Sequence, residues 1–242
     1  MHGCLAAGAG DDTGQEGIRH GGFDVELTYP DIVDLVGVES ALDPLGADET
    51  VTWRMYVPET YDPDVPAGLI VYISPEPSGK IRANWRPVIE AGNLIWIAAN
   101  DSGNRTPTGK RILLASLAPY VASARYAIDP ERVYLSGFSG GGKAAGIASL
   151  HLAELFKGAI FICGAELRPD VGPEQLASAA TNRYVFLTGN RDFNRDLTRQ
   201  VYRKFERLGL ANVMLMIVPG MGHSRPDGAQ FQEALRYLDT RE

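Results

Sequence analysis

The sequence predicts an α/β protein with an open, mostly parallel β-sheet and helices on both faces. Continuous apolar runs from Leu69 onward have the length of strands that are buried on both faces. Helical patterns separate these runs, as in repeated strand–helix units. Two earlier segments alternate apolar and polar residues, which is typical of half-exposed strands near a sheet edge.

The strands are predicted from these runs in chain order. The two alternating strands come first and the six apolar strands follow. The ranges are Phe23–Thr28, Val51–Val57, Leu69–Ser74, Leu94–Ala99, Val133–Ser136, Ala159–Cys163, Tyr184–Thr188 and Val213–Val218.

Four helices are predicted between these strands. Pro119 lies inside the first of them and is expected to kink it, because proline removes a helical hydrogen bond. The ranges are Arg111–Tyr126, Ser139–Leu155, Asp196–Leu208 and Gln230–Leu238.

Length and composition limit the possible classes of protein. The chain has 242 residues, 45% of them hydrophobic, and a formal net charge of −7. This charge argues against a nucleic-acid-binding surface, and no apolar run reaches the roughly 20 residues that span a bilayer. Residues 1–21 are rich in glycine and are expected to form a flexible tail, and residues 22–242 are expected to form one domain.

The stretch from Val133 to Lys143 carries the most information about function. An apolar strand enters the sequence Gly137-Phe-Ser139-Gly-Gly141, and a helix rich in small residues follows it. Strand, sharp turn and helix in this order indicate a nucleophile elbow, in which glycines next to the serine let the backbone pass without Cβ clashes. The turn would present the Ser139 hydroxyl beside the first N–H groups of a helix, which favour an anion.

Elimination selects the base that would activate this serine. His2 and His20 lie in the predicted tail, where nothing fixes their geometry. His151 lies twelve residues after Ser139 on the same predicted helix, about 18 Å away at 1.5 Å per residue. His223 remains, in a glycine-flanked loop after the last strand, and is the predicted general base.

Several carboxylates could orient the imidazole of His223. Asp192 is the first choice, since it follows a buried strand by four residues and precedes a helix. Asp196 is the rival, although it fits the first turn of that helix, where carboxylates stabilise the helix end. Asp170 and Glu166, in a connection rich in proline and glycine, are the remaining alternatives.

An oxyanion hole requires two N–H donors near the nucleophile. The backbone N–H of Gly140, directly after Ser139, is the first. The second is expected from the loop 74–79, whose two prolines have no N–H. Glu76 is the first choice there, with Ser74 and Ser78 behind it; the alternative is a rigid loop without a donor.

The two cysteines, Cys4 and Cys163, do not form a disulfide framework. Cys163 ends an apolar run and is expected to be a small buried side chain. Cys4 lies in a segment that resembles a bacterial lipoprotein cleavage site, which suggests a lipid anchor at Cys4 and favours an exported protein over a cytoplasmic one.

Three segments give the chain a family resemblance. They are Trp53-Arg-Met-Tyr-Val-Pro-Glu-Thr-Tyr, Asp129-Pro-Glu-Arg-Val-Tyr-Leu-Ser-Gly-Phe-Ser-Gly-Gly and Pro219-Gly-Met-Gly-His223. By these segments, and by the chain order of Ser139, Asp192 and His223, the sequence resembles the α/β-hydrolases. More narrowly, it resembles the group of polyhydroxybutyrate depolymerases and feruloyl esterases. In one departure, Ser74-Pro75 stands where such esterases usually carry His-Gly.

The resemblance implies a serine esterase with Ser139, Asp192 and His223 as its catalytic residues. No cofactor and no metal are expected, and the predicted substrate is a small, neutral or aromatic ester. An acyltransferase or a peptidase would use the same three residues, and a non-catalytic binding protein of the same fold is the further alternative. Residues 164–182 could form a lid, although a surface connection is the simpler interpretation.

Overall fold

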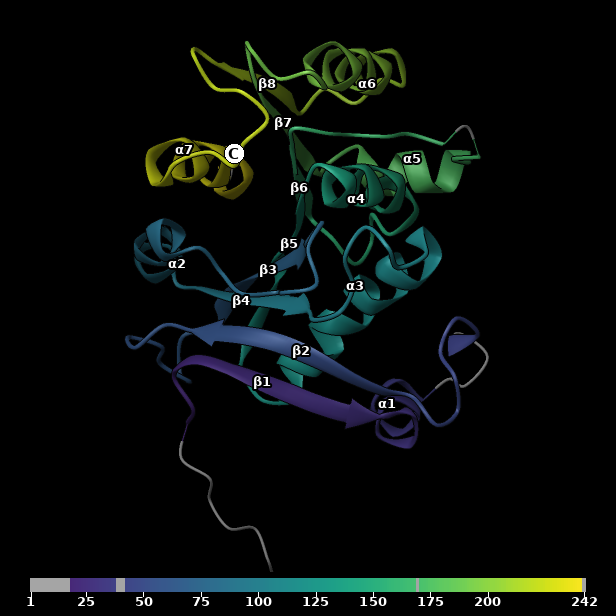
Figure 1. Ribbon diagram of the computed structural model, residues 1–242, viewed down its shortest axis with the longest axis vertical. Coiled ribbons are helices and arrows are strands. Elements are labelled where there is room, and N and C mark those ends of the chain that lie inside the picture. Colours follow the sequence, from purple (N-terminus) through teal and green to yellow (C-terminus); the bar gives the residue numbers. More distant parts are fainter. Residues whose placement is uncertain (1–17, 38–41, 169, 241–242) are drawn as a thin grey trace, which may run out of the picture.

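The described residues form a sheet of eight strands at the centre of the molecule (Figure 1). The computed structural model describes residues 18–37, 42–168 and 170–240. The spatial order of the strands is β1-β2-β4-β3-β5-β6-β7-β8. Their bounds are β1 Gly21–Thr28, β2 Thr50–Val57, β3 Ala67–Ile73, β4 Leu94–Ala99, β5 Ile128–Phe138, β6 Gly158–Ile162, β7 Arg183–Gly189 and β8 Val213–Val218.

The pairing of the strands confirms the predicted mostly parallel sheet. β1 and β2 are antiparallel to each other, and β2 is antiparallel to β4. The strands from β3 to β8 are parallel to their neighbours. The carboxyl ends of these parallel strands therefore meet at one edge, where ligands bind in open α/β sheets.

Helices cover both faces of this sheet, as predicted (Figure 1). α2 and α7 pack on one face, with Ile89 and Phe231 in the core there. α1, α3, α4 and α6 pack on the other. The helix bounds are α1 Tyr29–Val36, η2 Ala83–Trp85 (a short 3₁₀ turn), α2 Arg86–Ala91, α3 Thr108–Ser123, α4 Gly140–His151, α5 Pro173–Ala179, α6 Arg195–Arg207 and α7 Gly228–Asp239.

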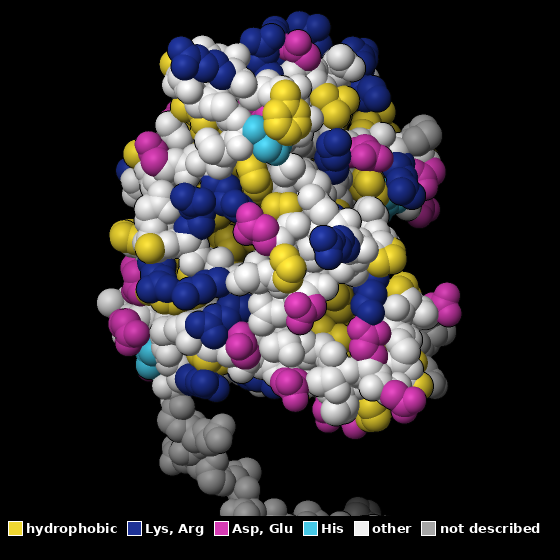
Figure 2. Space-filling view, in the orientation of Figure 1, with side chains coloured by type: hydrophobic (Ala, Val, Ile, Leu, Met, Phe, Trp, Pro, Cys, Tyr) yellow, Lys and Arg dark blue, Asp and Glu magenta, His cyan; other side chains and the backbone are white. Residues whose placement is uncertain are grey.

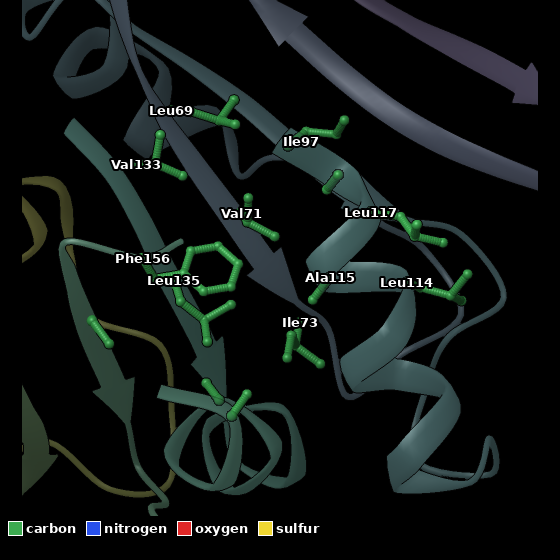
Figure 3. Close-up of a cluster of buried hydrophobic side chains, with 14 of the residues drawn as sticks. Leu69, Val71, Ile73, Ile97, Leu114, Ala115, Leu117, Val133, Leu135 and Phe156 are labelled. Carbon is green, nitrogen blue, oxygen red and sulfur yellow. The ribbon is translucent and has the colours of Figure 1, made fainter. Parts of the chain in front are cut away.

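The central strands hold β5, the strand that leads to Ser139, in place through their apolar side chains. β3, with all of its residues buried, lies between β4 and β5. Figure 3 shows side chains of β3, β4 and β5 directed toward α3, with Phe156 closing the cluster. The labelled side chains are those of Leu69, Val71, Ile73, Ile97, Leu114, Ala115, Leu117, Val133, Leu135 and Phe156.

The structure differs from the sequence prediction mainly in its short helices. α1, α2, α5 and η2 were not predicted, and α4 ends at His151 rather than at Leu155. α3 begins before the predicted Arg111 and continues through Pro119. β8 is apolar but only half-buried, because it is the last strand of the sheet and has a neighbour on one side only.

The predicted boundary after residue 21 falls inside β1, which begins at Gly21. Just before it, His20 Nδ1 lies 2.7 Å from the carbonyl oxygen of Pro58. Cys4, with its predicted lipid anchor, and His2 lie outside the described residues. Within the described ranges, the helices are all too short or too polar to cross a bilayer.

Residues 164–182 begin beside Ser139, and the described part then follows α4 away from it. A Cβ at Gly164 would lie 2.5 Å from the carbonyl oxygen of Ser139, so the segment starts against the elbow. Farther on, His151 at the end of α4 pairs with Asp170 at 3.5 Å. Because α4 leads away from Ser139, its far end lies away from the active edge. The described part of this segment thus forms a surface connection and not a cap.

Candidate active site

Ser139 lies at a sharp turn between β5 and α4. Its φ is 56°, a left-handed conformation that a residue other than glycine rarely adopts. The turn is tight enough that a Cβ at Gly141 would lie 1.9 Å from the carbonyl oxygen of Ile73. The Ser139 N–H donates to the carbonyl oxygen of Ile162 on β6, 2.8 Å away, which ties the strained residue to the sheet.

Ser139, His223 and Asp192 come together from three loops at the carboxyl edge. His223 Nε2 lies 2.9 Å from Ser139 Oγ. His223 Nδ1 lies 2.7 Å from Asp192 Oδ1. The Asp192 side chain is fully buried, whereas 20% of the His223 side chain is exposed. A substrate can therefore reach the imidazole and the serine, while water has no access to the carboxylate.

The environment of Asp192 favours its ionised form. Burial raises the pKa of Asp192, but hydrogen bonds from the Asn194 N–H, the Thr188 hydroxyl and His223 outweigh burial and lower the pKa below its usual value. Thr188 Oγ1 donates to Oδ2 at 2.7 Å and Asn194 N donates to Oδ1 at 3.0 Å. An ionised Asp192 can only accept, so Nδ1 of His223 carries the proton and Nε2 is free to accept from Ser139.

Asp192→Asn is expected to lower the free energy of unfolding at pH 7. It is also expected to make the free energy of unfolding fall less steeply as the solution is acidified. Folding lowers the Asp192 pKa from the ordinary value of 3.8. The carboxylate therefore contributes stability that is fully present above pH 3.8 and is lost as the pH falls through the folded pKa. Urea unfolding at pH 7 and at pH 3, followed by tryptophan fluorescence, measures this effect. A difference between the two proteins that stays constant across this range would contradict the prediction.

Cys163 lies beside Asp192 and His223 and contacts the loop after β8. Cys163 is buried, as expected, and its Sγ lies 3.3 Å from the carbonyl oxygen of Ser224, next to His223. Burial and the nearby Asp192 carboxylate raise the pKa of the Cys163 thiol to about 12, so it remains protonated. The ligand atoms of Cys163, Asp192 and His223 lie within 4.8 Å of one another. A metal ion there would have to displace the thiol proton and the Asp192–His223 hydrogen bond, so we interpret this group as a hydrogen-bond network.

The other candidates for the acid have partners elsewhere. Asp196 is exposed in the first turn of α6 and pairs with Arg195 at 2.9 Å. Asp170 pairs with His151, at the far end of α4. The backbone of Glu166 packs against Gly146, in the middle of α4.

The ring of Phe193 lies over the imidazole of His223. The two ring centroids are 4.0 Å apart, and Phe193 is 78% exposed. Phe138, the residue before the nucleophile, contacts the same imidazole with centroids 5.0 Å apart. The imidazole of His223 is therefore in contact with two apolar rings. Phe193 is not among the residues that the sequence predicts for the site, although its position directly after Asp192 is a usable signal.

No protein-family model matches the sequence, and no curated protein matches it. Many solved structures are nevertheless similar. One is a feruloyl esterase module from Clostridium thermocellum, an S954A mutant complexed with sinapinate. It has 14% identity and a TM-score of 0.64, over 90% of this chain and 88% of that chain. A second is Est1E from Butyrivibrio proteoclasticus, with 13% identity and a TM-score of 0.57, over 77% of this chain and 92% of that chain.

A third is esterase 2 from Thermogutta terrifontis, phosphonylated by cyclosarin. It has 19% identity and a TM-score of 0.53, over 81% of this chain and 89% of that chain. At these identities the similarity establishes the fold. The chain has the α/β-hydrolase fold. The predicted fold class and the resemblance to the feruloyl esterase group in structure are thereby confirmed.

In an α/β-hydrolase the oxyanion hole combines the N–H after the nucleophile with an N–H from the loop after the third strand. Gly140 is the first residue of α4, so its N–H has no acceptor within the helix. The Glu76 N–H, the predicted second donor, donates to Ser74 Oγ at 3.1 Å. Asn104 lies close by, since a Cβ at Gly140 would meet its carboxamide. An oxyanion would therefore have to share or displace the contact between Glu76 and Ser74.

Arg111 joins the loops that surround this hole. Its guanidinium is buried and donates to the carbonyl oxygens of Ser74 at 2.8 Å, Ser102 at 3.0 Å and Gly140 at 3.3 Å. Burial lowers the pKa of Arg111. One side chain of α3 thus positions the loop after β3, the loop after β4 and the elbow. Periodicity places Arg111 on a helix, but it does not reveal that the side chain turns inward to loop carbonyls.

Arg111→Met is expected to lower the free energy of unfolding by roughly 2 kcal/mol, because it leaves buried carbonyl oxygens without a donor. It is also expected to lower kcat, since the elbow and the loop after β3 lose their common anchor. Thermal unfolding and ester hydrolysis measure the two effects. Arg125→Met is the matched control, because Arg125 is exposed just after α3 and its side chain donates to the carbonyl oxygen of Val121, near the end of that helix. Equal losses in the two variants would show that Arg111 has no special role.

Proposed function

We propose that the chain is a serine hydrolase that cleaves carboxylic esters through an acyl-enzyme at Ser139. One observation carries the proposal: His223 Nε2 lies 2.9 Å from Ser139 Oγ while Nδ1 of the same ring lies 2.7 Å from a buried Asp192. A strained turn that presents a serine to such a histidine has the geometry of an activated nucleophile. The esterases among the similar structures support this reaction class.

The reaction then follows from the roles of the three side chains. Ser139 Oγ attacks the ester carbonyl carbon while its proton passes to His223 Nε2. The Gly140 N–H and a second donor from the loop after β3 stabilise the negative charge on the carbonyl oxygen. His223 next gives its proton to the leaving alcohol and then activates a water that releases the acid. Asp192 remains ionised and holds the imidazolium through Nδ1–H.

The first test is a pair of measurements on the purified chain. Hydrolysis of short p-nitrophenyl esters reports turnover, and a fluorophosphonate probe read by intact mass reports an activated serine. Turnover together with one adduct, located by peptide mapping to Ser139, supports the proposal. An adduct elsewhere, or a folded chain that gives neither product, overturns it.

Water and other acyl acceptors compete for the same acyl-enzyme. Adding an alcohol or an amine to the assay separates a hydrolase from an acyltransferase. We expect the free acid as the main product, since water is the acyl acceptor in the proposed mechanism. A predominance of the transfer product would assign the chain to the acyltransferases instead.

A further inference from the structure

Arg225 lies one aromatic ring away from the reacting groups. Its guanidinium carbon is 4.5 Å from the centre of the Phe138 ring, and that ring is 5.0 Å from the imidazole of His223. Phe138 directly precedes Ser139, and Arg225 follows His223 by two residues. The mechanism proposed above does not use this cation.

The guanidinium of Arg225 is held in a fixed position. The side chain is 14% exposed, and its Nε lies 3.2 Å from the hydroxyl of Tyr72, near the end of β3. Stacking on Phe138 fixes the plane of the group from a second side. Arginine in such a position is ready to bind a carboxylate through two parallel N–H groups of its planar guanidinium.

Glu76, an exposed side chain, pairs with one nitrogen of this guanidinium. Its Oε1 lies 2.9 Å from Arg225 Nη2, and the Glu76 side chain is 60% exposed. An ion pair with one exposed partner contributes little free energy, so another carboxylate can replace Glu76 at small cost. Glu76 also belongs to the loop that borders the predicted oxyanion hole, so the exchange would take place beside the scissile bond.

Positive charge gathers here on a chain whose formal net charge is −7. Arg82 is close enough to Tyr72 to influence its hydroxyl, and its guanidinium carbon lies 5.9 Å from the ring of the buried Trp85. Figure 2 shows a hollow in this face of the molecule with hydrophobic side chains at its floor. Lys and Arg side chains and an acidic side chain border it. The surroundings therefore favour a ligand that combines an apolar body with a negative charge.

We propose that the preferred substrates are esters that also carry a carboxylate, which replaces the Glu76 carboxylate on Arg225. This inference rests on the proposed ester hydrolysis and extends it to a substrate class that the sequence analysis did not expect. The reaction is ordinary ester hydrolysis. A hemiester monoanion of a dicarboxylic acid and water give the dicarboxylate, the alcohol and one proton, and an ester whose alcohol part carries the carboxylate gives the free acid anion, the hydroxycarboxylate and one proton.

Pairs of substrates that differ only in the charged group test the proposal. Monomethyl glutarate is compared with methyl pentanoate, monomethyl adipate with methyl hexanoate, and 4-acetoxybenzoate with phenyl acetate, all by acid release in a pH-stat. We expect kcat/KM for the carboxylate member to exceed that of its neutral partner by roughly 10- to 100-fold in at least one pair. A neutral member that is hydrolysed as fast or faster in every pair overturns the proposal. If the chain turns over p-nitrophenyl esters but none of the six esters, this proposal alone is overturned; if it turns over neither set, the proposed ester hydrolysis is overturned as well.

Variants assign the preference to Arg225. For each protein we compare kcat/KM for the carboxylate ester with kcat/KM for its neutral partner. Arg225→Gln is expected to bring this ratio close to one. Arg225→Lys is expected to keep only part of the preference, because an ammonium cannot form two parallel hydrogen bonds to a carboxylate. Glu76→Gln is expected to raise the ratio, since the competing carboxylate is gone. Arg236→Gln removes the same charge from an exposed position on α7 and should leave the ratio unchanged.

The ratio also separates binding from a structural role. If Arg225 only fastens the histidine loop to the loop after β3, Arg225→Gln slows both members of a pair equally, and the ratio stays as in the unaltered chain. That outcome overturns the proposal. If Arg225→Gln does not fold, the ratio in Glu76→Gln decides: an increase supports the proposal and no change overturns it.

Discussion

Ser139→Ala is expected to lower kcat for ester hydrolysis by roughly 10⁶-fold, because alanine removes the only atom that can form the acyl-enzyme. Binding of the ester should change little, since the substitution leaves the neighbouring rings and the loop after β3 in place. Rates of p-nitrophenyl ester hydrolysis by the variant and by the unaltered chain, measured at saturating substrate, give the ratio. The fluorophosphonate adduct should disappear in the same variant.

A serine on β5, three residues before Ser139, provides the control. Ser136 is buried and donates from Oγ to the carbonyl oxygen of Ile160 at 3.1 Å. Ser136→Ala removes the same atom from β5 without touching His223, so activity should stay within a few-fold of the unaltered chain. If Ser139→Ala retains activity comparable with Ser136→Ala, then Ser139 is not the nucleophile.

Gly141→Ala is expected to destabilise the fold more than any other single methyl addition discussed here. The new Cβ would lie 1.9 Å from the carbonyl oxygen of Ile73 and 2.8 Å from its carbonyl carbon, both of them backbone atoms of β3. No side-chain rotation can relieve this overlap, so α4 has to move away from the sheet. We expect a loss of about 3 kcal/mol or more in the free energy of unfolding.

Gly109→Ala is the matched control for that substitution. Gly109 lies in the first turn of α3, and an added Cβ there meets no atom within 4 Å. Because alanine favours helix more than glycine does, this variant should gain up to about 1 kcal/mol. Urea unfolding of both variants beside the unaltered chain measures the two effects. A Gly141→Ala protein as stable as Gly109→Ala would mean that the elbow can accommodate a Cβ beside the Ile73 carbonyl group.

The sequence predicted the parallel strands and the convergence of three side chains for physical reasons. A strand buried on both faces must be apolar throughout, and parallel order brings its following loops to one edge. His223 could be found by elimination because the chain has four histidines. Periodicity failed for α2 and α5, which have only six and seven residues, too few to repeat an apolar face.

The start of α1 could have been found from sequence, whereas the second oxyanion donor could not. Thr28 and Asp31 cap α1 reciprocally, with a spacing that a capping-box pattern describes. Whether the Glu76 N–H is free to bind an oxyanion depends instead on the rotamer of Ser74, whose Oγ accepts a hydrogen bond from it. The contact between Glu76 and Arg225 joins loops that are far apart in the sequence, and no local pattern reports such a pair.

The proposed nucleophile and the proposed base follow strands in two different parts of the sheet. The nucleophile follows β5, which has a neighbouring strand on each side, whereas His223 follows β8, which pairs with β7 alone. Regions with fewer buried contacts open at a lower free energy than the centre of a domain. Heating would then separate the base from the serine before the central strands part. We therefore expect thermal inactivation of the proposed esterase to report a local opening at the sheet edge, at a lower temperature than the melting curve of the whole chain.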